Sequence, residues 1–428
     1  MKLLSKKNIY LDYAGATPID KKVAKIMSSY EEGFFSNPSA IHKDGVIVRN
    51  VIEEARGKIG KQINAHSDEI IFTGSGTESD ALAILGTVKN YELIIKNENI
   101  EYRIPHIITS KIEHPAVLLN CKILEERGGA EVTYISVDKN GILNLEEFEK
   151  ALKENTILVS IMYANNEIGT IQPLQEIAKI IRRFRKSKSA TQSFALETLK
   201  ARSFTADLPY FHTDACQAMN YLYTENIEKL GVDMMSFNSS KIYGPKGIGI
   251  LFKKRDVELC ALYSGGGQEF GLRSGTESVS LIVGLANAFE ITNKIKQKES
   301  ERLSIIRDYG IEKLLSLSGT LGYKIILNGD KEKRLPNNLN ISILGISSEL
   351  LVIELSSLGF LVSEKSACKS DDHNTSYVID AIRKVCPKEG SEVMGSLRVS
   401  LGRYTTKGDI NAFIQAVKKI LNKYKHWK

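Results

Sequence analysis

The sequence has few cysteines, and their arrangement excludes two kinds of stabilised fold. The five are odd in number, scattered and without a Cys-x-x-Cys pair: Cys121, Cys216, Cys260, Cys368 and Cys386. This pattern argues against a disulfide framework and against a structural zinc site. It favours a reducing compartment, where thiols stay free.

Long apolar runs and a strong charge of one sign are also missing. No run approaches the ~18 uncharged apolar residues of a membrane-spanning helix, and no apolar signal core follows the basic first seven residues. The 58 basic and 51 acidic residues give a net charge of +7, a mild excess that does not by itself predict nucleic-acid binding. We therefore expect a cytoplasmic protein without a membrane partner and without direct nucleic-acid contacts.

The pattern of elements predicts an α/β fold. The 428 residues allow two or three domains of ~150 residues each. Strand-like and helical segments alternate, which predicts a mostly parallel central sheet with helices on both faces. The expected strands lie at residues 70–72, 106–110, 131–136, 156–163, 210–213, 233–237 and 249–252.

The pattern changes after residue 267, which suggests a second, smaller α+β domain. We expect a large domain at 17–277 and a small domain made of 1–16 and 278–428, with a polar loop at 363–375. Two polar stretches, 91–104 and 182–206, look like insertions in the large domain. The second begins with a basic run that contains no acid before Glu197. Its simplest interpretation is a solvated loop, and the alternative is a docking site for an acidic partner or for RNA.

Polar residues follow four of the expected strands. They are His114, Asn166 after Asn165, Asp214 and Lys241. Ligands of parallel sheets bind beyond the carboxyl ends of the strands, so we expect these side chains to converge there. Lysine is the most informative of them, because burial lowers its pKa and the neutral amine is the nucleophile in Schiff-base chemistry. The alternative is a strand-end lysine whose ammonium reaches water.

A turn of small residues, Thr73 to Ser79, separates the strand at 70–72 from a helix. Backbone N–H groups at such a helix start bind anions, although a serine or threonine helix cap explains the turn almost as well. A cofactor with a carbonyl for the lysine, a phosphate for the turn and a ring nitrogen for a carboxylate is pyridoxal 5'-phosphate. Asp214 is the candidate carboxylate, with a turn cap as the alternative.

Ten short motifs follow one another along nearly the whole chain. They are Tyr-Leu-Asp-Tyr-Ala (10–14), Phe-Thr-Gly-Ser-Gly-Thr-Glu-Ser-Asp (72–80), Glu-His-Pro-Ala-Val (113–117), Asn-Asn-Glu-Ile-Gly (165–169), His-Thr-Asp-Ala-Cys-Gln (212–217), Lys-Ile-Tyr-Gly-Pro-Lys-Gly-Ile-Gly (241–249), Gly-Gly-Gly-Gln-Glu (265–269), Arg-Ser-Gly-Thr (273–276), Ser-Ala-Cys (366–368) and Leu-Arg-Val-Ser-Leu-Gly-Arg (397–403). In these motifs the chain resembles the cysteine desulfurases, which form the class V branch of the aminotransferase-like pyridoxal phosphate enzymes. The resemblance implies their fold, fold type I. It also implies sulfur supply for iron–sulfur cluster assembly or tRNA thiolation.

The resemblance assigns a role to each matching residue. Lys241 would form the Schiff base and move the Cα proton of the substrate, while His114 would stack on the cofactor ring and act as an acid–base group. Arg398, with Asn166, would bind the substrate carboxylate. Thr276 would reach the cofactor phosphate of a second subunit, which implies a homodimer. The remaining implied cofactor contacts are Gly76, Thr77, Ser239 and Ser240 at the phosphate, Asn166 and Gln217 at the phenolic oxygen, and Asp214 at the ring nitrogen.

Cys368 is the implied nucleophile. It lies in the polar loop between Lys365 and Lys369, whose charges favour the thiolate. The resemblance implies that L-cysteine becomes L-alanine while Cys368 receives the sulfur as a persulfide and passes it to an acceptor, either an iron–sulfur scaffold or a tRNA-thiolation protein. We expect no resident metal, and at most a transient contact of Cys368 with a cluster.

Two rival enzymes and one non-enzyme remain open. A selenocysteine lyase or an aminotransferase belongs to the same class of pyridoxal phosphate enzymes, and a non-catalytic sulfur-relay protein would keep the fold alone. The chain also departs from the family at two motif positions. Ser240 stands where a histidine is usual, and Phe270 where an arginine is usual.

Overall fold

The structure is a computed structural model that describes residues 8–97, 103–192, 208–319, 322–364, 376–383 and 394–425. The α-helices of these ranges are α1 (Lys21–Gly33), α2 (Lys43–Ile63), α3 (Gly76–Asn97), α4 (Pro115–Glu126), α5 (Leu145–Ala151), α6 (Leu174–Gln192), α8 (Ile227–Leu230), α9 (Val279–Leu315), α10 (Ser348–Ser357), α11 (Tyr377–Arg383) and α12 (Lys407–Tyr424). None of these helices is long and apolar enough to cross a membrane. The strands are β1 (Ile9–Tyr10), β2 (Ile70–Thr73), β3 (His106–Ser110), β4 (Glu131–Ile135), β5 (Thr156–Ser160), β6 (Tyr210–Asp214), β7 (Met234–Asn238), β8 (Gly249–Lys253), β9 (Ile325–Leu327), β10 (Asn338–Leu344), β11 (Phe360–Leu361) and β12 (Met394–Ser400).

Seven strands form the central sheet, in the order β2-β8-β7-β6-β5-β3-β4. The five strands from β7 to β4 are parallel, and β8 runs antiparallel to both of its neighbours. The predicted α/β fold with a mostly parallel central sheet is therefore confirmed. Because the strands are parallel, the carboxyl ends of β3, β5, β6 and β7 meet at one edge of the sheet.

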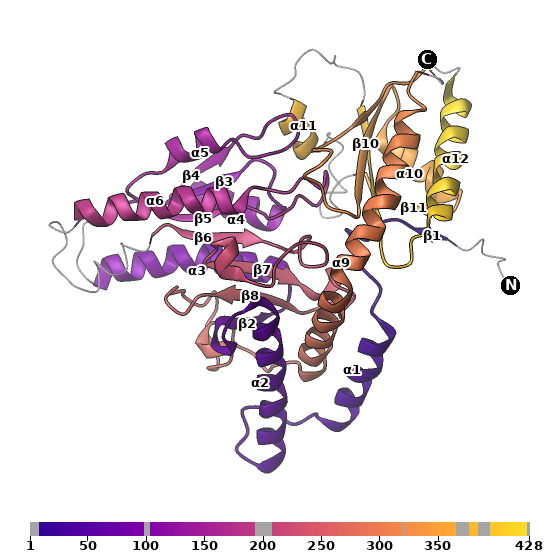
Figure 1. Ribbon diagram of the computed structural model, residues 1–428. Helices are drawn as coiled ribbons and strands as arrows, with labels where there is room; N and C mark the ends of the chain where they lie inside the picture. Colours follow the sequence, from indigo (N-terminus) through magenta and orange to yellow (C-terminus); the bar gives the residue numbers. More distant parts are fainter. Residues whose placement is uncertain are drawn as a thin grey trace.

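Helices cover both faces of this sheet (Figure 1). Successive strand residues point to opposite faces, so neighbours in one strand belong to different cores. Ile71 and Ile107 pack in a core with α3 and α4, while Phe72 and Ile108 pack in a core with α2, α6 and α9. The continuous apolar runs of these strands follow from this burial on both sides.

A second core lies beyond the large sheet. The antiparallel strands β12-β10-β9 pack with α10, α12 and the C-terminal half of α9. Helix α9 has 37 residues and contributes side chains to both cores, from Val279 in the first to Leu314 in the second. The domain boundary at residue 277 stays a prediction.

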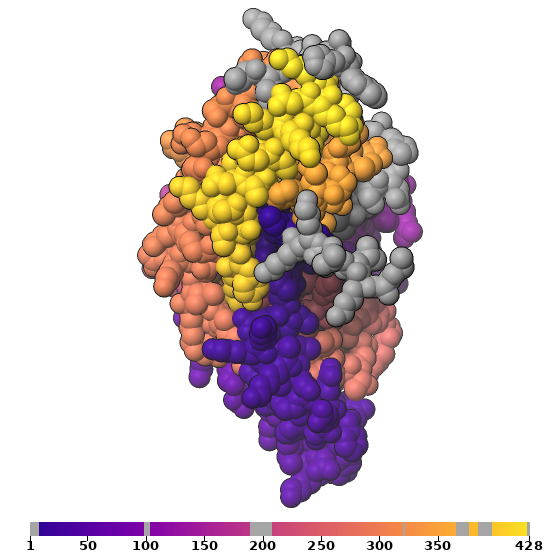
Figure 2. Space-filling view, turned by 90° about the vertical axis from the view of Figure 1, so that its right-hand side faces the viewer, coloured from indigo at the N-terminus to yellow at the C-terminus, as the bar shows by residue number. Residues whose placement is uncertain are grey.

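The N-terminal segment joins this second core. Strand β1 pairs in parallel with β11, and Leu11 is fully buried in the second cluster. Asp12 forms an isolated bridge with Ser400 at the end of β12. Figure 2 shows these N-terminal residues, in indigo, against the yellow C-terminal part of the chain. The two ends of the sequence therefore build one piece of structure.

The two stretches expected to be inserted begin as helix. Helix α3 continues to Asn97 and α6 continues to Gln192, so the interpretation of 182–206 as a loop is wrong for its described part. In α3, apolar spacing explains why the helix continues. Tyr91, Ile94 and Ile95 are buried and extend the side of α3 that faces the core. Residues 98–102 and 193–207 lie outside the described residues.

Candidate active site

Lys241 ends the short 3-10 helix Ser239–Lys241, which follows β7 directly. Asn238 caps this helix, since its Oδ1 accepts a hydrogen bond of 3.1 Å from the backbone N of Ser240. The Lys241 side chain is half-buried, and its Nζ donates to the carbonyl oxygens of Ala14 at 2.9 Å and Gly15 at 2.6 Å. The ammonium is thus held by the N-terminal segment, within the protein.

One cavity brings most of the predicted residues together. It has a volume of about 170 Å³ and lies at the carboxyl ends of the parallel strands. Its lining includes Gly76, Thr77, His114, Asn166, Asp214, Gln217, Lys241 and Arg398, together with Ala14, Gly15, Asp80 and Cys216. The expectation that polar residues of four strand ends converge is therefore met in the structure.

Helix α3 points its N-terminus at this cavity. Gly76 is the first residue of the helix, and its backbone lies close to the Cys216 side chain. A Cβ at residue 76 would lie only 2.7 Å from Cys216 Sγ. The turn before it is held by Glu78, whose Oε2 accepts from the Gly74 backbone N at 2.7 Å. Arg273 in turn binds Glu78 at 2.9 Å. The Glu78 N–H donates to the Ser75 hydroxyl at 3.2 Å, whereas Gly76 and Thr77 line the cavity, where their N–H groups and the helix dipole suit an anion such as a phosphate.

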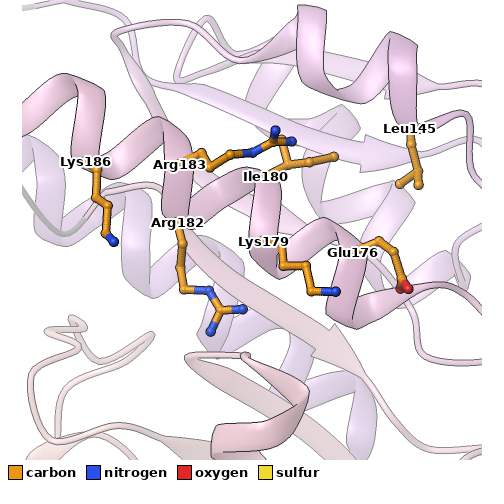
Figure 3. A pocket seen from close by; sticks show the side chains of 7 residues that line it. All are labelled: Leu145, Glu176, Lys179, Ile180, Arg182, Arg183 and Lys186. Carbon is orange, nitrogen blue, oxygen red and sulfur yellow. The ribbon is translucent and has the colours of Figure 1, made fainter.

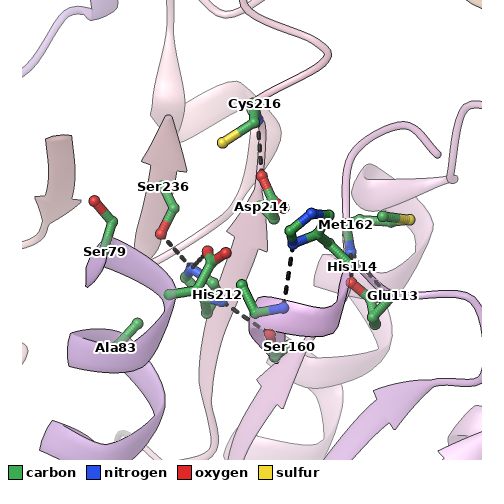
Figure 4. Close-up of polar contacts among 12 residues, drawn as sticks. Ser79, Ala83, Glu113, His114, Ser160, Met162, His212, Asp214, Cys216 and Ser236 are labelled. Carbon is green, nitrogen blue, oxygen red and sulfur yellow. Dashed lines mark hydrogen bonds and ion pairs between the residues drawn. The ribbon is translucent and has the colours of Figure 1, made fainter. Parts of the chain in front are cut away.

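Asp214 is buried and His114 is half-buried, and the charge of Asp214 acts on the His114 ring. Asp214 ends β6, and its Oδ1 accepts from the Cys216 backbone N at 2.8 Å (Figure 4). His114 caps α4, with Nδ1 accepting from the Ala116 backbone N at 3.1 Å. Burial lowers the pKa of His114, partly opposed by Asp214. The neutral ring therefore carries its proton on Nε2, because Nδ1 is an acceptor.

His212 lies near this pair, and its ring is held in place and neutral. Its two ring nitrogens lie 2.9 Å from the hydroxyls of Ser160 and Ser236 (Figure 4). Full burial lowers the pKa of His212 to about 4. These contacts fix the ring next to Asp214 without adding a positive charge.

Asp80 is a site residue that the sequence analysis missed. It lies on the first turns of α3, is 1% exposed and lines the cavity. Burial and the nearby Asp214 raise the pKa of the Asp80 carboxyl well above its ordinary value. The motif Thr-Glu-Ser-Asp was visible in the sequence, but no local pattern shows that Asp80 faces Asp214.

Arg398 projects from β12 into the same cavity and is 1% exposed. Its guanidinium binds Asp12 Oδ1 at 2.9 Å and the Asn166 carbonyl oxygen at 3.3 Å. Arg398 Nε and Asn166 Oδ1 are buried without a hydrogen-bond partner among the described residues. These two atoms are available to a polar ligand, and Asp12 is a second contact that sequence reasoning missed.

Several predicted residues lie elsewhere. Ser239 Oγ is buried against Gly244, and Ser240 Oγ donates to Asn238 Oδ1 at 3.2 Å, so neither lines the cavity. Thr276 is exposed and outside the cavity. Cys368 lies outside the described residues.

The cavity also contains a half-buried cysteine, Cys216, whose thiol is a weak nucleophile. Cys216 lines the cavity, but burial and the carboxyl of Asp214 raise the pKa of its thiol well above the ordinary value. A thiol that stays protonated is a poor nucleophile. Cys216 thus fills space beneath Gly76.

Phe270 adopts an unusual conformation where the chain departs from its motif. Its φ of 57° and that of 49° at Glu269 lie in the left-handed region, which bulky residues rarely adopt. Glu269 is held there by Arg56 through two contacts of 2.8 Å and by the Phe72 backbone N at 2.7 Å. Arg56 also lies 5.1 Å from the Phe270 ring centroid. The buried ion pair therefore fixes the 265–271 segment to α2, and the hydrogen bond from Phe72 fixes it to β2.

Comparison with known proteins agrees with this geometry. The model of the family described as aminotransferase class-V matches residues 9–413. The chain is similar to a cysteine desulfurase IscS of Dictyoglomus turgidum, with 41% identity over 98% of this chain and 95% of that one. Among solved structures, it is similar to a NifS-like protein, with a TM-score of 0.81, 33% identity and coverage of 97% and 99%. It is also similar to SspA in complex with cysteine, with a TM-score of 0.72, 31% identity and coverage of 93% and 99%.

Proposed function

The chain belongs to the class-V aminotransferase family and is a pyridoxal phosphate-dependent cysteine desulfurase, and we propose that it moves sulfur from L-cysteine to Cys368 and releases L-alanine. The observation that carries the proposal is the single cavity in which Lys241, Asp214 and Arg398 meet. A relative of similar structure is described in complex with cysteine, which supports cysteine as the substrate.

The residues of the cavity fit pyridoxal phosphate. The N-terminus of α3 at Gly76 and Thr77 would hold the phosphate, and Asp214 would hold the ring nitrogen. Asn166 Oδ1, buried without a partner among the described residues, fits the phenolic hydroxyl together with Gln217. When bound, the cofactor supplies a carbonyl carbon for amines and a ring that withdraws electrons from the substrate's Cα.

Lys241 has two tasks in this proposal. Its amine is the nucleophile that attaches the cofactor to the protein, and it then takes the proton from the substrate's Cα and returns it. The carbonyls of Ala14 and Gly15 orient Nζ into the cavity. His114 keeps a neutral ring with a proton on Nε2, so it would serve as a hydrogen-bond donor or proton source without adding charge.

Arg398 would bind the substrate carboxylate through its planar fork of N–H donors. Asp12 holds one side of the guanidinium, which fixes its orientation, while Nε has no partner among the described residues. A fixed guanidinium places the substrate's Cα in one position relative to Lys241. Such positioning is a large part of enzymatic rate enhancement.

Cys368 would attack the substrate sulfur as a thiolate. A sulfur–sulfur bond forms as the Cβ–S bond breaks, and the remainder leaves as L-alanine. The described residues that flank the 365–375 segment contact residues of the cavity region. Ser363 exchanges two backbone hydrogen bonds with Arg398, and Ser376 Oγ donates to Glu167 Oε2 at 2.5 Å.

Mass spectrometry of the holoenzyme after one addition of L-cysteine tests this proposal. We expect added sulfur on the peptide that contains Cys368 and an equal amount of L-alanine. Cys368→Ala should lose sulfide release while keeping cofactor absorbance, and Cys260→Ala is the matched control on a distant thiol. Undiminished sulfide release by Cys368→Ala would show that another group accepts the sulfur.

We further propose a homodimer in which Thr276 reaches the cofactor phosphate of the partner subunit. Thr276 is exposed, and Phe35 and Ile41 expose 87% and 95% of their surface. Pro38 and Glu277 line one hollow, so the loop around Pro38 and the segment that follows Thr276 lie close together. Light scattering should give twice the chain mass of 47.6 kDa, and Thr276→Val should weaken cofactor binding. A monomer with full cofactor affinity would contradict the proposal.

The sulfur acceptor and the compartment belong to the proposal as well. We propose a protein acceptor, either an iron–sulfur scaffold or a tRNA-thiolation protein, in the cytoplasm. Transfer of labelled sulfur from the Cys368 persulfide to each purified candidate would distinguish the two.

A further inference from the structure

Helix α6 carries an exposed basic surface that desulfurase chemistry does not use. We call it the basic groove, defined by the residues that line a hollow of about 600 Å³ between α5 and α6: Leu145, Glu176, Lys179, Ile180, Arg182, Arg183 and Lys186. Figure 3 shows its cationic side chains spread along α6, with Leu145 across from them on α5. Glu176 marks the end nearest the start of α6.

The spacing of these cations is unfavourable for a helix. Arg182 and Arg183 each lie three or four residues from both Lys179 and Lys186, where side chains are neighbours and like charges repel. Other helices of this chain place a carboxylate four residues from a lysine, as in the ion pairs Lys58–Glu54, Lys122–Glu126, Lys150–Glu146 and Lys294–Glu290. The basic groove therefore costs helix stability, which suggests that the charges serve another purpose.

Most of these cations have no carboxylate partner in the part of the chain that the structure describes. Arg183 contacts Glu149 at 3.3 Å, an exposed pair worth little in water. Lys179, Arg182 and Lys186 are exposed and form no ion pair with a described residue. The four cations outnumber the single lining carboxylate, Glu176, so the groove carries a net positive charge that attracts anionic groups.

The floor of the groove is apolar. Ile180 is 6% exposed and Leu145 is half-buried, with the aliphatic stems of the cations around them. No aromatic side chain lines the groove, whereas proteins that bind single-stranded RNA usually stack bases on aromatic rings. An apolar floor with a cationic rim suits a polypeptide that carries both leucine-like and acidic side chains.

The segment that follows α6 in the chain, residues 193–207, is not rich in acidic residues. Residues 193–207 contain two acids, Glu197 and Asp207, and two bases, Lys200 and Arg202. With no net charge, that segment offers no complement to the four cations. The charge of the groove therefore points to a different polypeptide as its occupant.

We propose that the basic groove docks an acidic segment of a partner protein, with an apolar side chain of that segment seated against Ile180 and Leu145. The two arginines bind carboxylates through paired N–H donors, which fixes orientation as well as affinity. The lysines contribute mainly to steering and to the rate of association.

A labelled synthetic peptide tests the proposal on the full-length holoenzyme. The probe is a glutamate peptide with leucine at every fourth position, and fluorescence anisotropy measures its binding at low and moderate salt. We expect Arg182→Glu combined with Lys186→Glu to weaken binding at least tenfold. The matched control, Lys418→Glu with Lys419→Glu, makes the same charge change on exposed positions of α12 and should alter binding less than twofold.

A second peptide, turnover measurements and a milder pair of variants complete the test. A glutamate peptide without leucine should bind at least fivefold more weakly, and L-cysteine turnover of all variants should match the wild type. If the charge reversal impairs folding, Arg182→Gln with Lys186→Gln replaces it and should still weaken binding. Equal losses in the two pairs of variants, or no measurable binding, would overturn the proposal. Tighter binding of a twelve-nucleotide single-stranded RNA would also overturn it, in favour of RNA.

Discussion

At the scale of single residues, the Arg398 guanidinium donates hydrogen bonds to two different residues. The Asp12 carboxylate and the Asn166 carbonyl oxygen each accept a hydrogen bond from one of its terminal nitrogens. The Nε atom has no partner among the described residues. A lysine at this position would keep the charge but lose the planar set of donors. The buried polar atoms left behind would then oppose substrate binding.

We expect Arg398→Lys to raise the KM for L-cysteine by about tenfold or more, because a bidentate contact worth about 1.5–3 kcal/mol is lost. The kcat should fall less, since Lys241 and the cofactor contacts remain. Steady-state kinetics of sulfide release measures both constants. Arg182→Lys on the surface of α6 is the matched control and should change neither. An unchanged KM in Arg398→Lys would remove Arg398 from the substrate site.

Glu113, next to His114, carries a buried proton. It is fully buried, and burial raises its pKa from the ordinary 4.5 to about 8, although Ser110 and the Met162 backbone donate to it. The native state therefore binds this proton more tightly than the unfolded chain does. Its contribution to stability is present below pH 4.5 and is lost as the pH rises towards 8.

We expect Glu113→Gln to flatten that dependence, because the amide keeps the shape and does not ionise. Relative to the variant, the wild type should lose free energy of unfolding between pH 5 and 8, with a slope approaching about 1.4 kcal/mol per pH unit. Urea unfolding at fixed cofactor concentration measures it, and exposed Glu125→Gln is the control. Parallel profiles for wild type and Glu113→Gln would mean that Glu113 is ionised in the native protein.

At the scale of elements, the join of β2 and α3 shows why a glycine stands at residue 76. A side chain at this helix start would meet Cys216 Sγ at 2.7 Å and Asn238 Cβ at 3.3 Å. The close approach leaves the N–H groups of α3 open towards the cavity. Backbone donors at a helix start are effective for anions only when nothing covers them.

We expect Gly76→Ala to weaken pyridoxal phosphate binding at least tenfold, because the new methyl group displaces the helix start or Cys216. Adding Cys216→Ala should restore most of the affinity, since it removes the nearest atom. Cys216→Ala alone is the control. Equilibrium dialysis of the cofactor measures all three dissociation constants. If the double variant binds as weakly as Gly76→Ala alone, crowding by Cys216 is not the cause.

Elements were predictable from the sequence where a local pattern specifies them. The strands and the polar residues at four strand ends follow from apolar runs and their polar ends, and the structure brings His114, Asn166, Asp214 and Lys241 to one cavity. Contacts made by backbone atoms, and contacts between residues far apart in the sequence, were not predictable. The carbonyls that hold Lys241 have no residue type to reveal them, and Asp12 meets Arg398 across 386 positions.

The helical extension of α6 was missed for a different reason. Its polar, basic composition over residues 182–192 resembles that of a solvated loop, whereas Ile177, Ile181 and the half-buried Phe184 keep the core-facing spacing. Amphipathic spacing outweighed composition here. The same helix surface then carries the basic groove.

At the scale of the whole molecule, the N-terminal segment and the C-terminal part share one core. Leu11 is fully buried among residues of α9, β10, β12 and α12. We expect Leu11→Ala to lower the free energy of unfolding by about 2–5 kcal/mol, as for other buried leucines. Urea unfolding measures it, and Leu119→Ala, at a site 49% exposed, is the control. A loss as small as that of the control would show that the segment packs loosely.

The pairing of Asp12 with Arg398 also sets the order in which the protein becomes active during its synthesis. The ribosome releases Asp12 among the first residues and Arg398 near the end, so the segment must wait for its partner strands while the sheet between them folds. A nascent chain stalled before β12 would have Lys241 and the start of α3, yet lack Arg398. Such a chain could take up cofactor early, but it would turn over L-cysteine only after the last strand emerged.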